Sequence, residues 1–436
     1  MNLPKNNQLL CGTGRFFGWG IAFGCVMGVA GSSGPIILSS AGVFMDALNS
    51  EFGWSRSDVS FAVTIYTMIT ALLLPLVGRV IDQIGARKIL IPMIIFSAFA
   101  ITLPVFMTQL WHFYLFIALF SIAGAFTTSL PYVRVISLWF DRRRGLFLGI
   151  VAAGIGIGFT IMPILMNFFL NIVGWRGAYV GVGAVILLDI CPIILFFVRD
   201  DPADVGLKPD GRDQEKVVAS ASPNVGMSLS AAMKTRTFWM LLVITFVFAF
   251  VFNGMAVHLV PLLKDNGLEA SQAVYIAAII GMSMFVSRIA IGYLLDKFFA
   301  PRLAIVVFLI GAGGIGLVAS NLSVTVSILA AAMIGVGIGA ETDIISYMAS
   351  RYFGLRSFGK IYGFLFSFFY IGTGLGPLVL GIAYEANGSY TSTLYQFTFL
   401  SVIIILVFLS FGPYKYQQNE ALENSDYSSA GIKGST

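Results

Sequence analysis

Short charged clusters divide the sequence into twelve long apolar runs, and this pattern constrains the fold more than any other feature. A helix needs roughly 20 apolar residues to cross the hydrocarbon of a bilayer, and each run is about that long. Only 11% of the residues are charged, whereas soluble domains hold about 25%. The runs lack the polar and apolar alternation of barrel strands. The sequence therefore predicts an all-α polytopic protein in the lipid bilayer, with twelve transmembrane helices.

The predicted spans fall into two groups of six. The first group covers residues 15–44, 56–79, 88–108, 112–139, 145–171 and 176–198. The second covers residues 236–263, 271–296, 302–320, 323–351, 358–384 and 391–413. We therefore expect two six-helix bundles, a linker and a disordered polar tail, with boundaries at 1–198, 199–234, 235–414 and 415–436.

An internal repeat links the two groups. The cluster GRVIDQIGARK at 78–88 returns as GYLLDKFFAPR at 292–302, an offset of 214 residues (292 − 78). Pro163 and Pro377 share this offset (377 − 163 = 214). Several positions with one offset indicate a single six-span unit written twice. Parallel repeats of this kind are expected of transporters that rock two halves around a site near the middle of the membrane.

The basic residues predict the orientation. An even number of spans places both termini on one side, and the loops of the other side hold only Arg56, Arg176 and Lys264. Because Lys and Arg accumulate in cytoplasmic loops, the termini, the linker and the tail are predicted to be cytoplasmic.

The first cluster resembles the loop motif of the major facilitator superfamily, which lies between spans two and three, through Gly78, Asp82, Gly85, Arg87 and Lys88. Four other stretches resemble the bacterial monocarboxylate transporter and oxalate:formate antiporter branch: GVFMDALNSEFGWSRSDVS, WFDRRRGLFLGIVAAG, DPADVGLKPDG and SRIAIG. The resemblance covers nearly the whole chain. It implies the major facilitator fold and a secondary carrier of small organic acids, often coupled to protons, in the bacterial cytoplasmic (inner) membrane.

Arg288 lies inside the eighth span, eight residues before Asp296 and so about 12 Å of helix from that boundary. An ionisable residue at membrane depth is costly and is a functional candidate by default. The resemblance places the family's substrate-binding arginine here, four residues before Gly292. A guanidinium can hold a carboxylate with two parallel hydrogen bonds. We therefore interpret Arg288 as a substrate-binding residue; the alternative is a structural ion pair with Glu341 or Asp343.

Glu341 and Asp343 are two positions apart in the tenth span, so their side chains point about 200° away from each other. One is expected to face the cavity and the other to pack elsewhere. A buried carboxyl group can take up a proton at physiological pH, which makes Glu341 the candidate for a proton relay. A structural ion pair is the equal alternative.

Three other ionisable residues lie within predicted spans. Arg134 in the fourth span is kept as a substrate candidate, although snorkelling or pairing with a gate residue is the favoured explanation. Asp189 in the sixth span is a weaker candidate beside the helix break expected at Pro192. His258 in the seventh span could titrate near neutral pH, although a lone histidine at this depth is more often simply hydrogen-bonded.

The loop motif also has an electrostatic interpretation. Asp82 would lie near the N-terminal end of a neighbouring span, or against Arg142 and Arg143, and would latch the halves on the cytoplasmic side. The alternative is that Arg87 and Lys88 only enforce the topology. Both interpretations can hold together.

The two copies of the motif are unequal, and the sequence departs from the family pattern elsewhere. The second copy of the motif keeps Asp296 but has Phe299 where the first has Gly85, so the first copy is the better candidate for the latch. Proton-coupled members carry a lysine after the proline of the first span, whereas here Pro35 is followed by Ile36. The eleventh span has Lys360 only at its cytoplasmic end, so the second mid-membrane cation of the oxalate carrier has no counterpart. A single deep cation suits a monoanion better than a dianion.

Other function classes fit poorly. Three glycines spell GxGxxG at 311–316, but inside an apolar span with no preceding strand, so a nucleotide site fails its context test. The mixed charges of the linker disfavour nucleic acid. With only His112 and His258 as histidines, no nucleophile, base and orienting group can be assembled. We expect no enzyme activity, metal or cofactor.

The leading hypothesis is an alternating-access carrier of a small organic anion, with a monocarboxylate as the expected substrate and with proton coupling or exchange. An exporter of a larger metabolite, such as a carboxylate siderophore or drug, is the alternative within transport. A non-transporting membrane sensor on the same fold is the alternative from another class. The sequence leaves the oligomeric state open, and a monomer is compatible with it.

Overall fold

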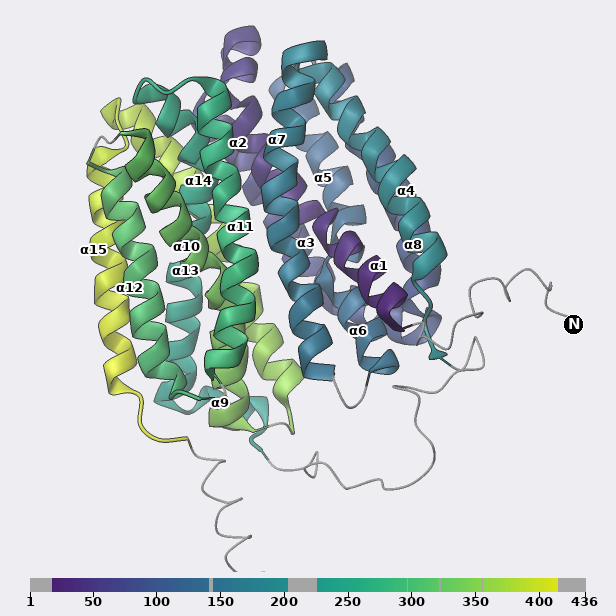
Figure 1. Cartoon of the computed structure of the whole chain (residues 1–436), viewed down its shortest axis with the longest axis vertical. Helices are drawn as coiled ribbons and strands as arrows, with labels where there is room; N and C mark the ends of the chain where they lie inside the picture. The colour runs from purple at the N-terminus through teal and green to yellow at the C-terminus, as the bar shows by residue number, and fades with distance from the viewer. Residues whose placement is uncertain are drawn as a thin grey trace, which may run out of the picture.

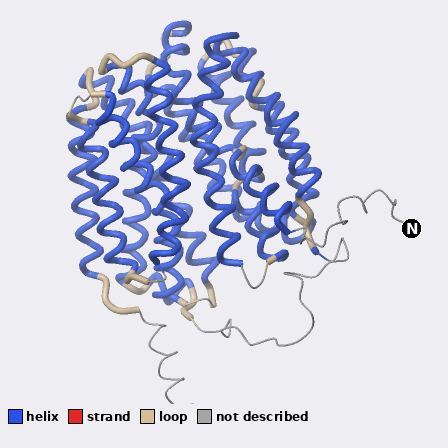
Figure 2. Tube along the Cα trace, viewed as in Figure 1, coloured by secondary structure: helices blue, strands red, loops and turns tan. Residues whose placement is uncertain are grey.

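The computed structural model describes residues 18–140, 144–202, 226–295, 297–320, 323–354 and 356–414, without the side chains of Asp82 and Arg144. The described residues form long helices that run side by side, and none of them belongs to a β-strand (Figures 1 and 2). The prediction of an all-α protein is confirmed.

The helices form two halves, coloured purple to teal and green to yellow in Figure 1. The first half holds α1 (Gly18–Ala30), α2 (Ser33–Phe52), α3 (Arg56–Ile84), α4 (Ala86–Ala100), η2 (Leu103–Phe106), α5 (Leu110–Phe126), α6 (Ser129–Trp139), α7 (Arg144–Val185), η3 (Ile186–Ile190) and α8 (Cys191–Phe197). The second half holds α9 (Leu229–Met233), α10 (Arg236–Asp265), α11 (Ala270–Leu295), α12 (Ala300–Val318), α13 (Val324–Phe353), α14 (Phe358–Asn387), α15 (Thr391–Val407) and η6 (Phe408–Ser410).

The described chain contains 11 helical stretches that are long and apolar enough to cross a membrane. The fifth, Gly145–Phe197, includes Gly174, whose φ of 69° and ψ of 176° are not helical. Glycine adopts a positive φ at little cost because it has no Cβ. Gly174 therefore divides this stretch into two limbs, and the twelve predicted crossings are accounted for.

The helix bundle has two ends. We call the lower end in Figure 1, where α9 lies, the linker face. Gly226 forms a β-bridge with Gly354 at this face. The opposite end holds the turns between α2 and α3, between α10 and α11, and between α14 and α15, and we call it the distal face.

The predicted spans 15–44 and 112–139 correspond to the stretches Gly18–Phe52 and Leu110–Trp139, and each stretch contains a short break in its helix. The backbone is extended at Ser32 (φ −70°, ψ 163°) and at Thr128 (φ −62°, ψ 179°). The Ser33 hydroxyl donates to the Gly124 carbonyl at 3.0 Å and lies 2.8 Å from the Tyr66 hydroxyl. Irregular backbone is tolerated at membrane depth where protein buries it, and apolar composition carries no signal for such a break.

The halves meet through three helix pairs. α3 packs against α14, α7 against α11, and α2 against α10. Each half supplies its own apolar core, for example the stacked rings of Phe140 and Phe147 at 3.7 Å in the first half and of Phe248 and Phe308 at 3.9 Å in the second. The buried apolar residues of the two halves nevertheless form one continuous cluster, and the three helix pairs join the halves within it.

Candidate functional site

Arg288 of α11 lies in the protein interior, and its side chain is 9% exposed. Its Nη1 lies 3.2 Å from Asp343 Oδ1, and its Nη2 donates to Thr342 Oγ1 at 2.9 Å. Its Nε is buried and has no hydrogen-bond partner among the described residues. A guanidinium offers five N–H donors. Arg288 therefore holds one carboxylate oxygen and one hydroxyl, and its donors are not all used.

Small residues of α13 bring this pair together. A Cβ at Gly335 would lie 2.5 Å from the Ile280 carbonyl oxygen of α11, so only glycine allows the two backbones to approach so closely. One turn on, a Cβ at Gly339 would lie 2.8 Å from the Met284 carbonyl oxygen. A further step of four residues on both helices reaches the ion pair of Arg288 with its acidic partner on α13. The glycine spacing thus sets the register of the two charged residues.

Glu341 and Asp343 point in different directions from α13, as their spacing predicts. Asp343 turns toward Arg288, and its side chain is 28% exposed. Glu341 is 0% exposed, and neither of its carboxyl oxygens has a hydrogen-bond partner among the described residues. The site therefore joins one paired carboxylate with one buried carboxyl group that lacks a partner.

His258 lies in another part of the protein, between the halves. It is fully buried on α10, and its Nε2 lies 2.8 Å from the Pro377 carbonyl and 3.0 Å from Ser60 Oγ. Its Nδ1 lies 2.8 Å from the Tyr390 hydroxyl. The structure therefore agrees with a hydrogen-bonded histidine and does not bring His258 to Arg288.

Arg134 and Asp189 also lie away from Arg288. Arg134 of α6 donates from Nη1 to the Ile81 carbonyl at 2.6 Å, close to the end of α3. This contact joins Arg134 to the backbone of the loop motif at 78–88. Asp189 is exposed on η3, a single turn of π-helix just before Pro192.

The loop motif packs against a residue that sequence reasoning missed. Gly85 has φ 97°, and a Cβ there would lie 2.7 Å from Asp200 Oδ2. The Arg87 amide donates to Asp200 Oδ1 at 2.8 Å, and Arg87 Nη2 donates to the Leu195 carbonyl at 2.8 Å. Asp200 thus caps the start of α4, where a carboxylate is favourable. The acidic pair that follows the sixth span was the available signal, since an acidic side chain is favoured at a helix start.

Most residues of the predicted latch lie outside the part of the chain that the structure describes. Arg142, Arg143 and Asp296 lie outside the described residues, and so does the side chain of Asp82. Lys88 is exposed at the linker face, and Gly78 has only Leu130 of its own half near the position of a Cβ, at 4.0 Å. A latch across the halves stays a prediction.

Helices α7 and α11 touch on the distal side and separate toward the linker face. A Cβ at Gly156 would lie 2.7 Å from the Gly281 carbonyl oxygen and from the Phe285 amide nitrogen. Gly149 lies seven residues away, about two turns and so on the same side of α7, yet no described atom outside its own helix lies within 4 Å of its Cβ position. Gly292, eleven residues after Gly281, is equally open on α11.

The pair formed by α3 and α14 behaves in the same way. A Cβ at Gly374 would lie 2.1 Å from Thr67 Oγ1. Gly363 lies eleven residues nearer the linker face, about three turns and so on the same side of α14, and no described atom lies within 4 Å of its Cβ position. Two independent helix pairs therefore indicate halves that are closed at the distal face and apart toward the linker face.

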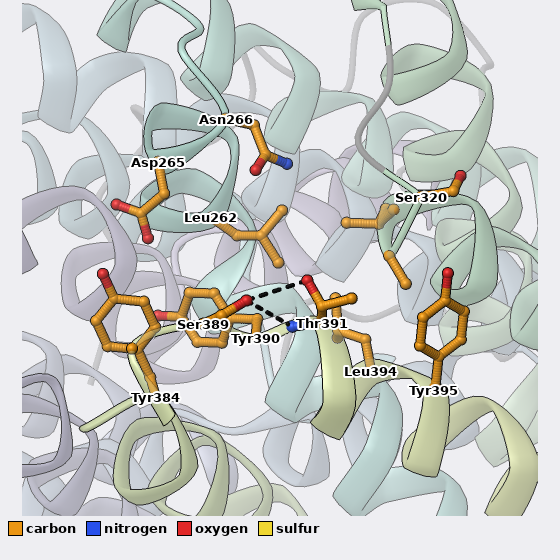
Figure 3. Close-up of a pocket in the computed structure, with 13 residues that line it drawn as sticks. Leu262, Asp265, Asn266, Ser320, Tyr384, Ser389, Tyr390, Thr391, Leu394 and Tyr395 are labelled. Carbon is orange, nitrogen blue, oxygen red and sulfur yellow. Dashed lines mark hydrogen bonds between the residues drawn. The ribbon is translucent and has the colours of Figure 1, made fainter. Parts of the chain in front are cut away.

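A pocket of about 490 Å³ lies at the distal ends of the second half. Figure 3 shows Asp265 and Tyr384 on one side of it and Ser320 and Tyr395 on the other. Ser389 bonds to the amide and hydroxyl of Thr391 at its centre. All its lining residues belong to the second half, so it lies beside the interface between the halves, far along the bundle from the Arg288 site.

The sequence matches a family model and is similar to proteins named as transporters. The model of the Major Facilitator Superfamily matches residues 27–356. Mouse monocarboxylate transporter 11 is 22% identical over 385 residues, which cover 86% of this chain and 83% of that protein. Rat monocarboxylate transporter 13 is 26% identical over 364 residues, covering 82% of this chain and 80% of that protein.

Solved structures share the fold. A bacterial homologue of the human lysosomal transporter Spinster, in an inward-facing and unoccupied conformation, superposes with a TM-score of 0.64 at 17% sequence identity. The superposition covers 91% of this chain and 96% of that chain. The prediction of two six-helix bundles in the major facilitator arrangement is confirmed.

Proposed function

The chain belongs to the Major Facilitator Superfamily, and from this premise we propose that it is a secondary active transporter of a small organic anion, with a monocarboxylate as substrate. The observation that carries the proposal is the arginine at membrane depth, Arg288, whose guanidinium holds one carboxylate oxygen and keeps a buried Nε without a described partner. The similarity to proteins named monocarboxylate transporters supports the substrate class.

The substrate carboxylate would take the place of Asp343 on Arg288. The observed pair is held by one Nη1 contact of 3.2 Å, whereas a free carboxylate could accept two parallel hydrogen bonds from the same guanidinium. Asp343 is the more exposed partner, at 28% against 9%, so it can move aside. One deep cation compensates one negative charge, which favours a monoanion.

Charge balance connects this exchange to a proton. Before the exchange Arg288 and Asp343 compensate each other; afterwards the substrate compensates Arg288, and a carboxylate of the site is left without a cation. An unpaired charge in the interior costs several kcal/mol, and a proton removes that charge. The balance requires that proton on Asp343, the carboxylate that loses its cation, and we assign its delivery to Glu341, which is fully buried and whose oxygens have no described partner. One proton would then accompany one monoanion.

The proposed cycle is alternating access around this site. The halves touch along the distal parts of α7 with α11 and of α3 with α14, and they separate toward the linker face. This arrangement corresponds to a state in which Arg288 is reached from the linker face. The inward-facing conformation named for the Spinster homologue supports the same interpretation.

We further propose that the linker face is cytoplasmic, in a bacterial cytoplasmic membrane, and that residues 199–234 link halves 1–198 and 235–414. Distal turns and helix ends carry few basic residues, namely Arg56, Arg176 and Lys264. The linker-face ends carry many more, among them Arg79, Arg87, Lys88, Arg199, Arg236, Lys297, Arg302, Arg356 and Lys360. This asymmetry supports the orientation.

Counterflow in liposomes tests the proposal. The purified protein is reconstituted, and labelled lactate, pyruvate, formate and oxalate are each tested with and without a pH gradient. We expect exchange of the monocarboxylates and weak exchange of oxalate, because the site has one deep cation. Absence of counterflow for every carboxylate would favour export of a larger metabolite or a sensor.

Replacement of the arginine tests the site. Arg288→Ala should lower transport of the best substrate by about a hundredfold, since two charge-assisted hydrogen bonds are lost. The matched control is Arg302→Ala, an exposed arginine at the start of α12, which should transport at the parental rate. Parental transport by Arg288→Ala would show that the substrate does not bind there.

A further inference from the structure

We propose that a polar network centred on Arg56 is the distal gate of this carrier, and that Arg56 is the residue on which closure of the gate depends most. The inference rests on the alternating access proposed above, and it assigns that movement to named contacts. Arg56 is the first residue of α3. Sequence reasoning treated it only as a marker of topology.

Arg56 joins the first half to two separate elements of the second. Its Nη1 and Nη2 donate to both carboxylate oxygens of Asp265, at the end of α10, at 2.6 and 2.8 Å. Nη1 also donates to the Tyr390 hydroxyl, in the turn before α15, at 2.8 Å. The guanidinium lies 3.9 Å from the ring centre of Tyr384 on α14. A bidentate pair and a cation–π contact thus meet on one side chain.

Two further contacts surround this pair and also cross between the halves. Lys264 of α10 pairs with Asp46 of α2. Glu385 of α14 accepts from the Ser57 amide at 2.8 Å and from the Ser57 hydroxyl at 3.0 Å. A carboxylate is favourable against the N-terminus of a helix, so the second half stabilises the start of α3 in the first. Neither contact can persist when the halves separate at this face.

Tyr390 connects the ionic layer to a buried one. The Pro377 carbonyl can only accept, so His258 Nε2 must carry a hydrogen and donate to it at 2.8 Å. The Tyr390 oxygen already accepts from Arg56, which leaves its own hydrogen to bond His258 Nδ1 at 2.8 Å. One neutral tautomer of His258 satisfies Pro377 and Tyr390, and Ser60 Oγ, which donates to the Arg56 carbonyl, can share the Nε2 hydrogen as a second acceptor at 3.0 Å. The contacts therefore run in one direction, from Arg56 through Tyr390 and His258 to the backbone of α14.

The backbones beneath the network are in close contact. A Cβ at Gly381 of α14 would lie 2.8 Å from Ser57 Cα. Thr64 Oγ1 of α3 donates to the Gly374 carbonyl at 2.8 Å and is buried. Without side chains at Gly374 and Gly381 the halves close tightly, which allows short polar contacts above them.

A matched ion pair lies on the same face but within one half. Arg176, in the second limb of α7, has Nη2 2.6 Å from Glu51 Oε1 at the end of α2. Its cation also lies 4.2 Å from the ring centre of Trp175. This pair has the same chemistry as that of Arg56, yet both residues belong to the first half. It therefore separates the effect of losing a distal ion pair from the effect of losing a contact between halves.

Cysteine labelling tests the gate without any substrate. Thr64→Cys places a thiol beneath the network, and a membrane-impermeant maleimide is added from the distal side of vesicles holding the full chain. Cys25 and Cys191 are buried, whereas Cys11 lies outside the described residues, so the protein without the reporter is labelled in parallel to give the background. Arg56→Ala should raise the labelling rate about tenfold, as expected for loss of a charge-assisted pair. Arg176→Ala should leave the rate unchanged.

Charge reversal provides the second test. Arg56→Glu should open the gate as Arg56→Ala does, and adding Asp265→Arg should return the labelling rate to within about twofold of the parent, because the bidentate pair forms again in reverse. Gly381→Val should also raise labelling, since its side chain meets the backbone of α3.

Two results would overturn the inference: an unchanged rate in Arg56→Ala, or an equal rise in Arg176→Ala. A change in labelling without transport of any carboxylate would leave the gate intact and reject only the proposed substrate.

Discussion

Two buried or half-buried arginines of this chain differ in how completely the protein pairs them. Arg56 makes a bidentate pair with Asp265, a hydrogen bond to Tyr390 and a ring contact with Tyr384. Arg288 makes a single carboxylate contact of 3.2 Å and keeps a buried Nε without a described partner. The first pairs with protein across an interface, and the second keeps donors available at membrane depth.

The same type of side chain has two roles in this protein. A guanidinium whose donors are paired within the protein stabilises the arrangement in which those partners meet, so Arg56 favours one conformation. A guanidinium with spare donors can exchange one carboxylate for another, so Arg288 can bind a ligand. Their positions in the sequence do not distinguish the two arginines, because both lie on transmembrane helices.

The largest expected difference comes from the same conservative change at both positions. Lysine keeps the charge but cannot form the planar fork of arginine. Arg288→Lys should reduce carboxylate transport by about ten- to a hundredfold, the loss of one hydrogen bond to a charged group. Arg56→Lys should reduce it by no more than about fivefold, because partly exposed ion pairs contribute about 1 kcal/mol or less. Initial rates of counterflow measure both, and equal losses would remove the distinction.

The next effect concerns the carboxyl group beside Arg288. Glu341→Gln keeps the shape of the side chain but cannot take up or release a proton. We expect about a tenfold loss of accumulation driven by a pH gradient, as is typical for a positioned proton-transfer group, with exchange retained. Accumulation and counterflow are measured on the same liposomes.

Asp189→Asn is the matched control for that change, because Asp189 is an exposed acidic residue. This variant should accumulate substrate like the parent protein. Full accumulation by Glu341→Gln would show that the proton reaches Asp343 without Glu341.

The smallest effect is expected from a neutral neighbour. Thr342 Oγ1 accepts from Arg288 Nη2 at 2.9 Å, and Thr342→Val removes this bond with little change in volume. A lost bond of this kind costs about 0.5–1.5 kcal/mol, so the apparent KM for the monocarboxylate should change about two- to tenfold. A change confined to the maximal rate would instead indicate an effect on the movement of the halves.

The fold could be predicted because its main signal is local and repeated. Apolar runs of span length, interrupted by charged clusters, leave few alternatives in a bilayer, and the offset of 214 residues shows the two halves in the sequence itself. The breaks at Ser32 and Thr128 escaped prediction. They depend on contacts of Ser33 with Gly124 and Tyr66, far apart in the sequence, which accept the interrupted backbone.

The sequence by itself determined which charges lie at membrane depth, because apolar runs surround Arg288, Glu341 and Asp343. Only the tertiary structure decided which carboxylate pairs with the arginine, since that depends on the register of α11 against α13. It also decided the role of Arg56, whose partners lie more than 200 residues away in the chain. Burial and hydrogen-bond partners depend on how the helices of both halves pack together, so they cannot be read from the periodicity of one helix.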